Sequence, residues 1–153
     1  MSSEVKIIGQ ERINAMLQEL NDIDSNKAIK SGIRKGVNLL RRGGIRRLKE
    51  RMKKPEGVTG NLLKAFQVHV KKNKLGGLAG FGMIADTHGG KIRAMHAFIV
   101  DLGTGERSRS DKGSTGIMPA LKYWTDTRNE DMDSAVDAVL KGTEQALLKI
   151  MSK

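Results

Sequence analysis

The sequence contains no cysteine among its 153 residues. This absence excludes disulfide bonds, cysteine-based zinc sites and thiol chemistry, and it fits a protein made in a reducing compartment. Aromatic residues are scarce as well, at 3% of the chain, so we expect a core built mostly from aliphatic side chains and methionine.

Long apolar runs are also missing. No stretch reaches the roughly 18 consecutive apolar residues that a membrane-spanning helix needs. Residues 1–30 contain no unbroken apolar segment, which argues against a signal peptide. We therefore expect a soluble intracellular protein with no membrane partner, and the length of the chain is typical of one domain.

Acidic residues are few compared with basic ones. Lysine and arginine number 28 against 17 aspartate and glutamate, and the formal net charge is +11. The excess is local, because residues 27–54 hold twelve basic residues against Glu50 alone, whereas residues 120–153 hold five basic and six acidic residues. A charge imbalance of this size favours a polyanionic partner.

The spacing of apolar residues predicts two helices in the N-terminal third of the chain. The first covers residues 11–20. The second is a long basic helix over residues 26–54, with Asp24 or Ser25 as its N-cap and a proline directly after it. The pair Gly43 and Gly44 inside this helix indicates either a kink or the close approach of another backbone.

The middle of the chain favours strands. Residues 66–71 alternate apolar and polar side chains, and residues 78–85 form a second candidate strand that glycines weaken. Residues 92–102 are apolar enough to be a buried strand or a buried helix. We expect residues 103–118, which are rich in glycine and serine, to form a long loop without secondary structure. Residues 120–128 are ambiguous, and a helical pattern resumes beyond them.

These elements indicate an α+β fold, in which N-terminal helices and a C-terminal helix pack on a small, mainly antiparallel β-sheet from which a long loop protrudes. We find no internal repeat and expect a single domain over residues 1–153. Its expected parts are an N-terminal arm and short helix (1–25), a long basic helix (26–54), a sheet region (59–102), a long loop (103–118) and a C-terminal helical region (119–153).

The sequence offers no catalytic or metal-binding constellation. The segment GFGMIA at residues 80–85 spells a relaxed dinucleotide fingerprint, but it follows a turn and opens no helix. The three histidines, His69, His88 and His96, lack metal-ligand spacing to nearby carboxylates. We therefore expect no catalytic residue, no metal, no cofactor and no enzymatic activity.

The basic helix leaves three interpretations open. It is a solvated outer face, or it contacts nucleic-acid phosphates without reading sequence, or it faces an acidic neighbour or lines a passage that nucleic acid crosses. The scarcity of aromatic residues argues against a single-strand binder. The residues of this candidate face are Arg34, Lys35, Arg41, Arg42, Arg46, Arg47 and Arg51.

Several features, in this order, resemble a known family. They are the basic helix, the motif Thr59-Gly60-Asn61-Leu62, the motif Asp101-Leu102-Gly103-Thr104, and Pro119 ahead of a closing helix. The combination covers roughly residues 27–150 and resembles the small neck and tail-completion proteins at the head-to-tail joint of long-tailed bacteriophages. The resemblance implies a structural virion protein of the neck, present in the host cytoplasm during assembly.

The resemblance also implies partners. Copies of the chain would form a ring, expected to be a hexamer, between the head connector and the tail tube, with other neck, connector and tail-tube proteins beside it and double-stranded DNA in its lumen. The alternatives are a tail terminator or head-side stopper of the same junction, or a small basic DNA-binding protein without sequence specificity. The residues expected to order against neighbouring subunits are Asp101, Gly103, Thr104, Gly105, Arg107, Arg109, Lys112, Gly113 and Pro119.

Overall fold

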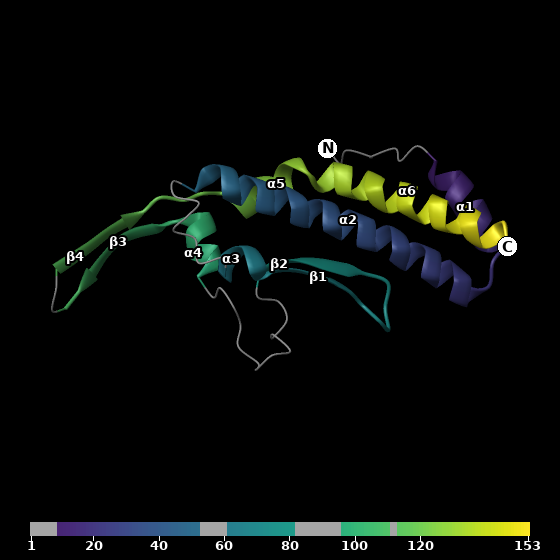
Figure 1. Cartoon of the computed structure of the whole chain (residues 1–153), viewed down its shortest axis with the longest axis horizontal. Helices are drawn as coiled ribbons and strands as arrows, with labels where there is room; N and C mark the ends of the chain where they lie inside the picture. The colour runs from purple at the N-terminus through teal and green to yellow at the C-terminus, as the bar shows by residue number, and fades with distance from the viewer. Residues whose placement is uncertain (1–8, 53–60, 82–95, 111–112) are drawn as a thin grey trace, which may run out of the picture.

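The computed structural model describes residues 9–52, 61–81, 96–110 and 113–153, and it confirms the α+β fold (Figure 1). Its helices are α1 (Gln10–Gln18), α2 (Asp22–Arg51), α3 (Asn61–Lys64), α4 (Ala97–Leu102), α5 (Tyr123–Glu130) and α6 (Met132–Met151). Its strands are β1 (Phe66–Val70), β2 (Gly77–Phe81), β3 (Thr104–Arg109) and β4 (Gly113–Met118).

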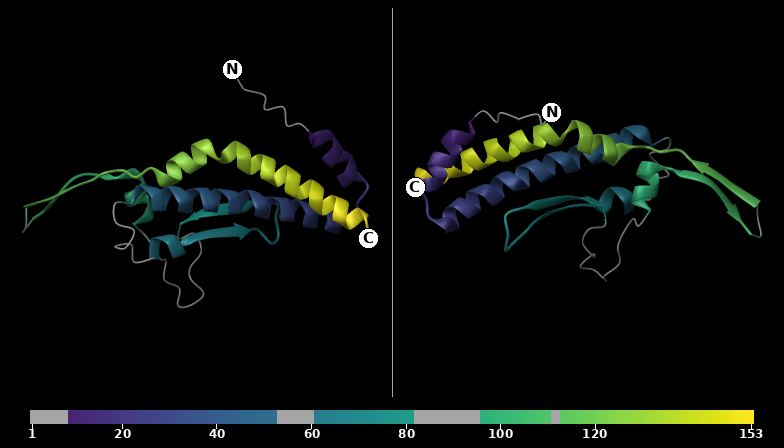
Figure 2. Two further views of the ribbon diagram at one scale, coloured as in Figure 1. Left: turned by 45° about the horizontal axis from the view of Figure 1, so that its top comes forward. Right: turned by 180° about the vertical axis from the view of Figure 1, so that it is seen from behind.

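The two long helices, α2 and α6, run antiparallel along the length of the molecule (Figures 1 and 2). Small residues let them approach closely. A Cβ atom added at Gly36 of α2 would lie 2.5 Å from Val139 Cγ2 and 2.8 Å from the Ala135 carbonyl oxygen, and one added at Gly142 of α6 would lie 3.0 Å from Gly32 Cα. Because there is no room for these atoms, the glycines set how closely the two helices pack.

The start of α2 differs from the prediction. Asn21 is the N-cap, and its side-chain oxygen accepts a hydrogen bond of 2.9 Å from the Asp24 amide. Asp24, which we predicted as a cap, therefore lies in the first turn, where its negative charge is favoured by the helix dipole. Asparagine caps as well as aspartate or serine, so the sequence alone does not separate these neighbouring candidates.

Gly43 and Gly44 do not interrupt α2, which continues to Arg51. Of the two alternatives for this pair, the structure shows a close approach, but the approaching groups are side chains and not another backbone. A Cβ atom at Gly44 would lie 2.5 Å from Phe66 Cε2 and 3.3 Å from Trp124 Cε3, and one at Gly43 would collide with the Asp131 carboxylate.

The buried core is mostly aliphatic, as expected, but aromatic side chains also gather at one end of the molecule. Phe66, Phe81, Tyr123 and Trp124 form a cluster of edge-to-face ring pairs, with the Phe66 and Phe81 ring centroids 4.3 Å apart. Although aromatic residues are scarce, they are concentrated where β1, β2 and α5 meet. The opposite end has the expected core of Ile13, Ala28 and Leu147 with aliphatic and methionine neighbours.

In the described residues the strands form two separate antiparallel pairs, β1–β2 and β3–β4, instead of one sheet. β1–β2 packs against α2, with Gly77 of β2 close to Ile33, whereas α6 packs on α2 and not on the sheet. β3–β4 projects away from the helices (Figures 1 and 2). The region 92–102, left open between strand and helix, contains α4, and 120–128 contains most of α5.

The predicted long loop at 103–118 is wrong, since these residues form the β3–β4 hairpin. Its register pairs Thr104 with Met118 and Arg109 with Gly113, with irregularities between them. Gly113 and Gly116 have positive φ angles of 71° and 79°, which suit a turn and a bulge. The segment has no apolar alternation and is rich in glycine and serine, so its composition conceals the two strands.

Candidate assembly surface: the β3–β4 hairpin and its root

The β3–β4 hairpin is the most exposed regular element of the described chain, and it extends beyond the helices in each view of Figure 2. Gly105, Glu106, Arg107 and Ser108 of β3 are exposed, as are Ser114 and Gly116 of β4. A side-chain bond near the tip of the hairpin runs from Ser114 Oγ to Glu106 Oε1 at 2.9 Å. Two-stranded ribbons are marginal in water on their own, so this hairpin depends on its attachment to the body or on a partner.

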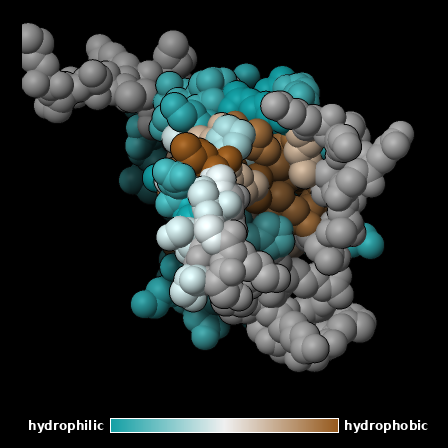
Figure 3. Space-filling model, turned by 90° about the vertical axis from the view of Figure 1, so that its left-hand side faces the viewer, coloured by the Kyte–Doolittle hydropathy of each residue, from teal (hydrophilic) through white to brown (hydrophobic). Residues whose placement is uncertain are grey.

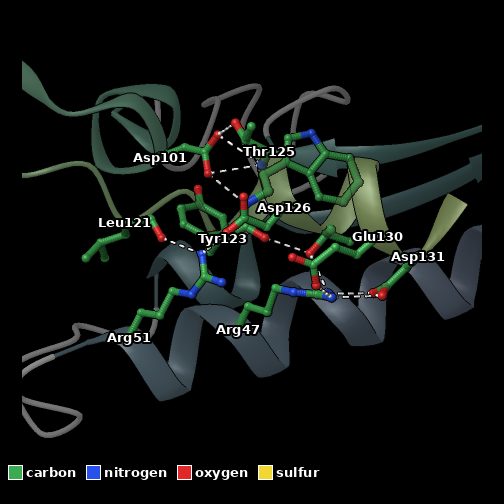
Figure 4. A network of polar contacts seen from close by, with 11 residues as sticks. Arg47, Arg51, Asp101, Leu121, Tyr123, Thr125, Asp126, Glu130 and Asp131 are labelled. Atoms are coloured by element: carbon green, nitrogen blue, oxygen red, sulfur yellow. Dashed lines mark hydrogen bonds and ion pairs between the residues drawn. The ribbon is translucent and has the colours of Figure 1, made fainter.

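Asp101, at the end of α4, fixes the attachment. Its side chain is 5% exposed and accepts hydrogen bonds from the amides of Trp124 and Thr125, at 2.7 Å and 3.2 Å, and from the Thr125 hydroxyl at 2.7 Å (Figure 4). These donors belong to the first turn of α5. The N-cap residue of α5, Lys122, makes no side-chain cap bond, and Asp101 caps the helix in its place from more than twenty residues earlier, where a carboxylate is favoured by the exposed amides.

The backbone on each side of the hairpin is joined at the same place, which we call the hairpin root. The Leu121 amide donates to the Val100 carbonyl at 3.0 Å, and the Lys122 amide donates to the Asp101 carbonyl at 2.8 Å. Thr104 Oγ1 accepts from the Met118 amide at 3.2 Å. These bonds bring α4 and the entry to α5 together, so the direction of the hairpin is set by buried contacts.

Gly103 has to be glycine at this root. Its φ is +74°, and an added Cβ would lie 2.7 Å from both the Ala120 nitrogen and the Met118 carbonyl oxygen. Thus three residues of the Asp101-Leu102-Gly103-Thr104 motif act inside their own chain. Asp101, which we predicted to contact neighbouring subunits, is buried and fully engaged; Gly103 and Thr104 likewise support the root.

Arginines of α2 hold the other side of the root (Figure 4). Arg47 is 6% exposed and donates from Nη1 to Asp131 Oδ2 at 2.6 Å and from Nη2 to Glu130 Oε2 at 2.7 Å. Arg51 Nη1 donates to Asp126 Oδ2 at 2.6 Å and to the Leu121 carbonyl at 2.8 Å. These three ion pairs tie the end of α2 to α5 and the start of α6.

Titration properties follow from these contacts. The hydrogen bond that Arg47 donates to Asp131 is the largest influence that raises the pKa of the Arg47 guanidinium, and the same bond holds the pKa of the Asp131 carboxyl below its ordinary value. Burial, followed by the negative charge of Asp101, raises the pKa of the Tyr123 phenol, whose hydroxyl donates to the Ala97 carbonyl at 2.9 Å. Each shift favours the protonation state found at neutral pH.

Arg47 and Arg51 therefore do not belong to the outward basic face that we predicted. The carboxylates that pair with these arginines belong to α5 and the start of α6, far from α2 in the sequence. The helical pattern of α2 alone therefore does not reveal the ion pairs. The remaining residues of the predicted face are exposed: Arg34, Lys35, Arg41, Arg42 and Arg46. Of these, Lys35 donates to the Gln145 side chain at 2.5 Å, and Arg41 Nε donates to the Phe66 carbonyl at 3.2 Å.

The structure distributes the remaining predicted loop residues along the hairpin. Gly105, Arg107 and Arg109 belong to β3, and Gly113 opens β4. Pro119 follows β4 and is exposed, whereas Lys112 lies outside the described residues. Of the other matched motif, Thr59 and Gly60 also lie outside them, and Leu62 in α3 is buried in the core.

Three exposed hydrophobic residues lie at the hairpin root, of which the sequence analysis named only Leu102, as part of the matched motif. Phe98 and Leu102 of α4 are 63% and 65% exposed, and Ile117 of β4 is 68% exposed. We call them the root hydrophobics. Figure 3 shows apolar side chains gathered on the end of the molecule that carries the hairpin. The signal for two of them was the four-residue spacing of Phe98 and Leu102, which places both on one helix face.

Within the described ranges, no group of three or more histidine, aspartate or glutamate side chains could hold a metal ion. No described helix is long and apolar enough to cross a membrane. What the hairpin root does contain is ion pairs, a helix cap and exposed apolar side chains. Such groups stabilise a fold or an interface between proteins.

Comparisons with protein-family models, with curated proteins and with solved structures found no match to this chain.

Proposed function

We propose that this protein is a structural subunit that assembles with copies of itself through the β3–β4 hairpin and the root hydrophobics. In this role it would act in the neck of a long-tailed bacteriophage, as the resemblance of its motifs implies. The observation that carries the proposal is the hairpin itself, which projects from the body beside three large apolar side chains that are each more than 60% exposed.

Burial of apolar area supports association at this end of the molecule. Burying a side chain of this size in an interface is favourable by on the order of 1.5–3 kcal/mol relative to leaving it exposed. Aromatic and large aliphatic side chains are also the usual energetic centres of protein interfaces. A neighbouring subunit that covers Phe98, Leu102 and Ile117 would recover that free energy.

The geometry favours a heterologous contact. The hairpin is a protrusion, and we infer that a different surface of the neighbouring subunit receives it. A contact between two unlike surfaces generates a ring when the rotation between subunits closes. The hairpin edges also expose backbone groups that can pair with a strand of a neighbour. The ring, its stoichiometry and its place between connector and tail tube are parts of this proposal.

The anchored root supports the same function. Because Asp101 and the two arginines fix the base of the hairpin, its ordering costs less entropy on association than that of an unattached loop. This arrangement is expected of a preformed docking element.

The proposal is tested by measuring the mass of the purified chain by light scattering and native mass spectrometry over a range of concentrations. The wild-type chain should form a closed oligomer of defined stoichiometry. The double variant Phe98→Ser/Leu102→Ser should weaken that assembly by at least about tenfold, since two interface anchors are lost.

Ile23→Ser is the matched control, because Ile23 is 77% exposed but belongs to the first turn of α2, far along the chain from the hairpin. It should leave the oligomer unchanged. A wild-type chain that stays monomeric at high concentration, or an oligomer unaffected by the α4 variants, would contradict self-assembly through this surface. Electron microscopy of intact particles would then test the neck location by showing whether the chain lies at the portal-to-tube junction.

A further inference from the structure

The basic residues in the second half of α2 and at Arg34 divide into two sets, those that form ion pairs at the root and those that do not. Arg47 and Arg51 are engaged by carboxylates. The other set is exposed along one side of the helix and consists of Arg34, Arg41, Arg42, Arg46 and Lys49. We call this set the basic ridge. In the described part of the chain no carboxylate lies within ion-pair distance of a ridge residue.

Helix geometry explains why these residues share a side. Arg34 and Arg41 are seven residues apart, Arg42 and Arg46 are four apart, and Lys49 follows Arg42 by seven, so all fall on neighbouring positions of the helical surface. The opposite sides of α2 are covered, by α6 near Gly36 and by β2 near Ile33. The ridge therefore lies on the one side of α2 that its neighbours leave uncovered.

A second group of cations adjoins the N-terminal half of α2. The turn between β1 and β2 carries Lys71, Lys72 and Lys74, all exposed. It is held to the helix by a hydrogen bond of 2.5 Å from Lys30 Nζ to the Lys72 carbonyl oxygen. Figure 1 shows this turn beneath the N-terminal half of α2. Lys30 thus holds three further cations beside the N-terminal half of α2, a connection that the sequence does not reveal.

From Arg34 to Lys49 the ridge is about 22 Å long, at 1.5 Å per helical residue. Each strand of a DNA duplex carries one phosphate per about 3.4 Å of helix axis, so a ridge of this length, laid along that axis, spans roughly six phosphates of one strand. We propose that the basic ridge and the lysines of the β1–β2 turn bind the phosphate backbone of double-helical nucleic acid without sequence preference.

The make-up of the ridge favours a duplex over an acidic protein. Protein interfaces have a core depleted of charge and built around apolar or aromatic anchors. On α2 the only exposed large hydrophobic residue among those described is Ile23, which lies at the far N-terminal end. Long flexible cations with no stacking aromatic beside them provide phosphate contacts, whereas base readout needs groups aimed at base edges.

The test is fluorescence anisotropy of the full chain with labelled 30-base-pair duplexes of two unrelated sequences, from 50 to 300 mM NaCl. The wild-type chain should bind both sequences equally, and its affinity should fall steeply with salt. The variant Arg34→Gln/Arg42→Gln/Arg46→Gln should bind at least about 30-fold more weakly at 100 mM salt. Its salt slope should be smaller by about 2 to 3, since each lost phosphate contact removes about 0.9 from the slope.

A matched control removes the same charge elsewhere. Arg128→Gln/Lys141→Gln/Lys149→Gln takes three exposed cations from α5 and α6, and it should keep the wild-type salt slope to within about 1. The variant Arg34→Lys/Arg42→Lys/Arg46→Lys retains the charges and should retain most of the affinity. Thermal unfolding of each variant verifies that it is folded.

Four outcomes would overturn the proposal. They are no duplex binding at 50 mM salt, equal weakening by the ridge and control variants, tighter binding of a single strand than of the duplex, and displacement of the duplex by polyglutamate more readily than by unlabelled duplex. The last would assign the ridge to an acidic protein. This proposal stands apart from self-assembly, because the Phe98→Ser/Leu102→Ser variant keeps the whole ridge and should still bind the duplex.

Discussion

Arg46 and Arg47 are adjacent in the sequence and differ in almost every physical respect. Arg46 is exposed, and no carboxylate among the described residues pairs with it, whereas Arg47 is 6% exposed and bonded to Asp131, Glu130 and Thr127. The same contrast separates the basic ridge from the arginines of the root. One helix thus uses its positive charge in two ways: the inward arginines hold the fold together, and the outward ones remain available to a partner.

The largest effect is expected from Arg47→Ala. Removing one member of a buried ion pair destabilises a protein by about 3–5 kcal/mol, and because the carboxylates of Asp131 and Glu130 are 18% and 59% exposed, the loss here should lie near the lower end of that range. We expect a loss of stability of that size, measured as the change in the free energy of unfolding in urea. The exposed neighbour provides the control, because Arg46→Ala should change the same quantity by less than about 0.5 kcal/mol. Equal effects of the two substitutions would abolish the distinction between the two sets.

How far the sequence anticipates this molecule depends on the range of the interactions involved. The α+β class, the long basic helix and the C-terminal helix follow from apolar residues at helical spacing, which is a local signal. The division of the arginines does not. The carboxylates that bind Arg47 belong to Glu130 and Asp131, more than eighty residues later, and nothing in the local pattern separates Arg47 from Arg46.

The hairpin shows a second limit of sequence analysis. Residues 103–118 contain glycine, serine and charged residues, and because neither face is buried there is no period-two apolar pattern to detect. The Asp101-Leu102-Gly103-Thr104 motif lies where α4 leads into the hairpin. Its chemistry, however, is internal, since Asp101 caps α5 and Gly103 fits a crowded left-handed position.

A substitution at Gly44 probes the packing on the inward side of α2. A methyl group at this position would lie 2.5 Å from the Phe66 ring, and the ring cannot retreat freely because it packs on Phe81 and Trp124. We expect Gly44→Ala to destabilise the protein by about 1–3 kcal/mol, as overpacking does, despite the better helix propensity of alanine. Thermal or urea unfolding measures this loss.

Gly105→Ala is the corresponding change at an exposed glycine of the hairpin. No atom lies within 4 Å of an added Cβ at that position in the hairpin, and the stability should stay within about 0.5 kcal/mol of the wild type. A Gly44→Ala protein as stable as this control would show that the aromatic cluster is loosely packed.

The cap at the root is tested by Asp101→Asn. The amide oxygen can still accept from one α5 amide, but the charge and the second acceptor are lost, so we expect destabilisation by about 1–2 kcal/mol. Because the root sets the direction of the hairpin, amide hydrogen exchange in β3 and β4 should become faster at the same time. A stability loss without faster exchange in the hairpin would confine Asp101 to the support of α5.

The smallest effect is expected from the pH dependence of the Arg47–Asp131 pair. The guanidinium holds the pKa of the Asp131 carboxyl below the value near 3.9 that an aspartate has in an unfolded chain. The stabilisation from this shift is therefore fully present above about pH 4 and is lost as the pH falls through the folded-state pKa. Urea unfolding between pH 7 and pH 2.5 should show Asp131→Asn losing less stability with acid than the wild type.

The control is Asp137→Asn, at an exposed carboxyl of α6, which should keep the wild-type dependence of stability on pH. If both variants flattened the curve equally, the acid sensitivity would belong to the net charge of the protein, and the inward arginine would have no special part in it.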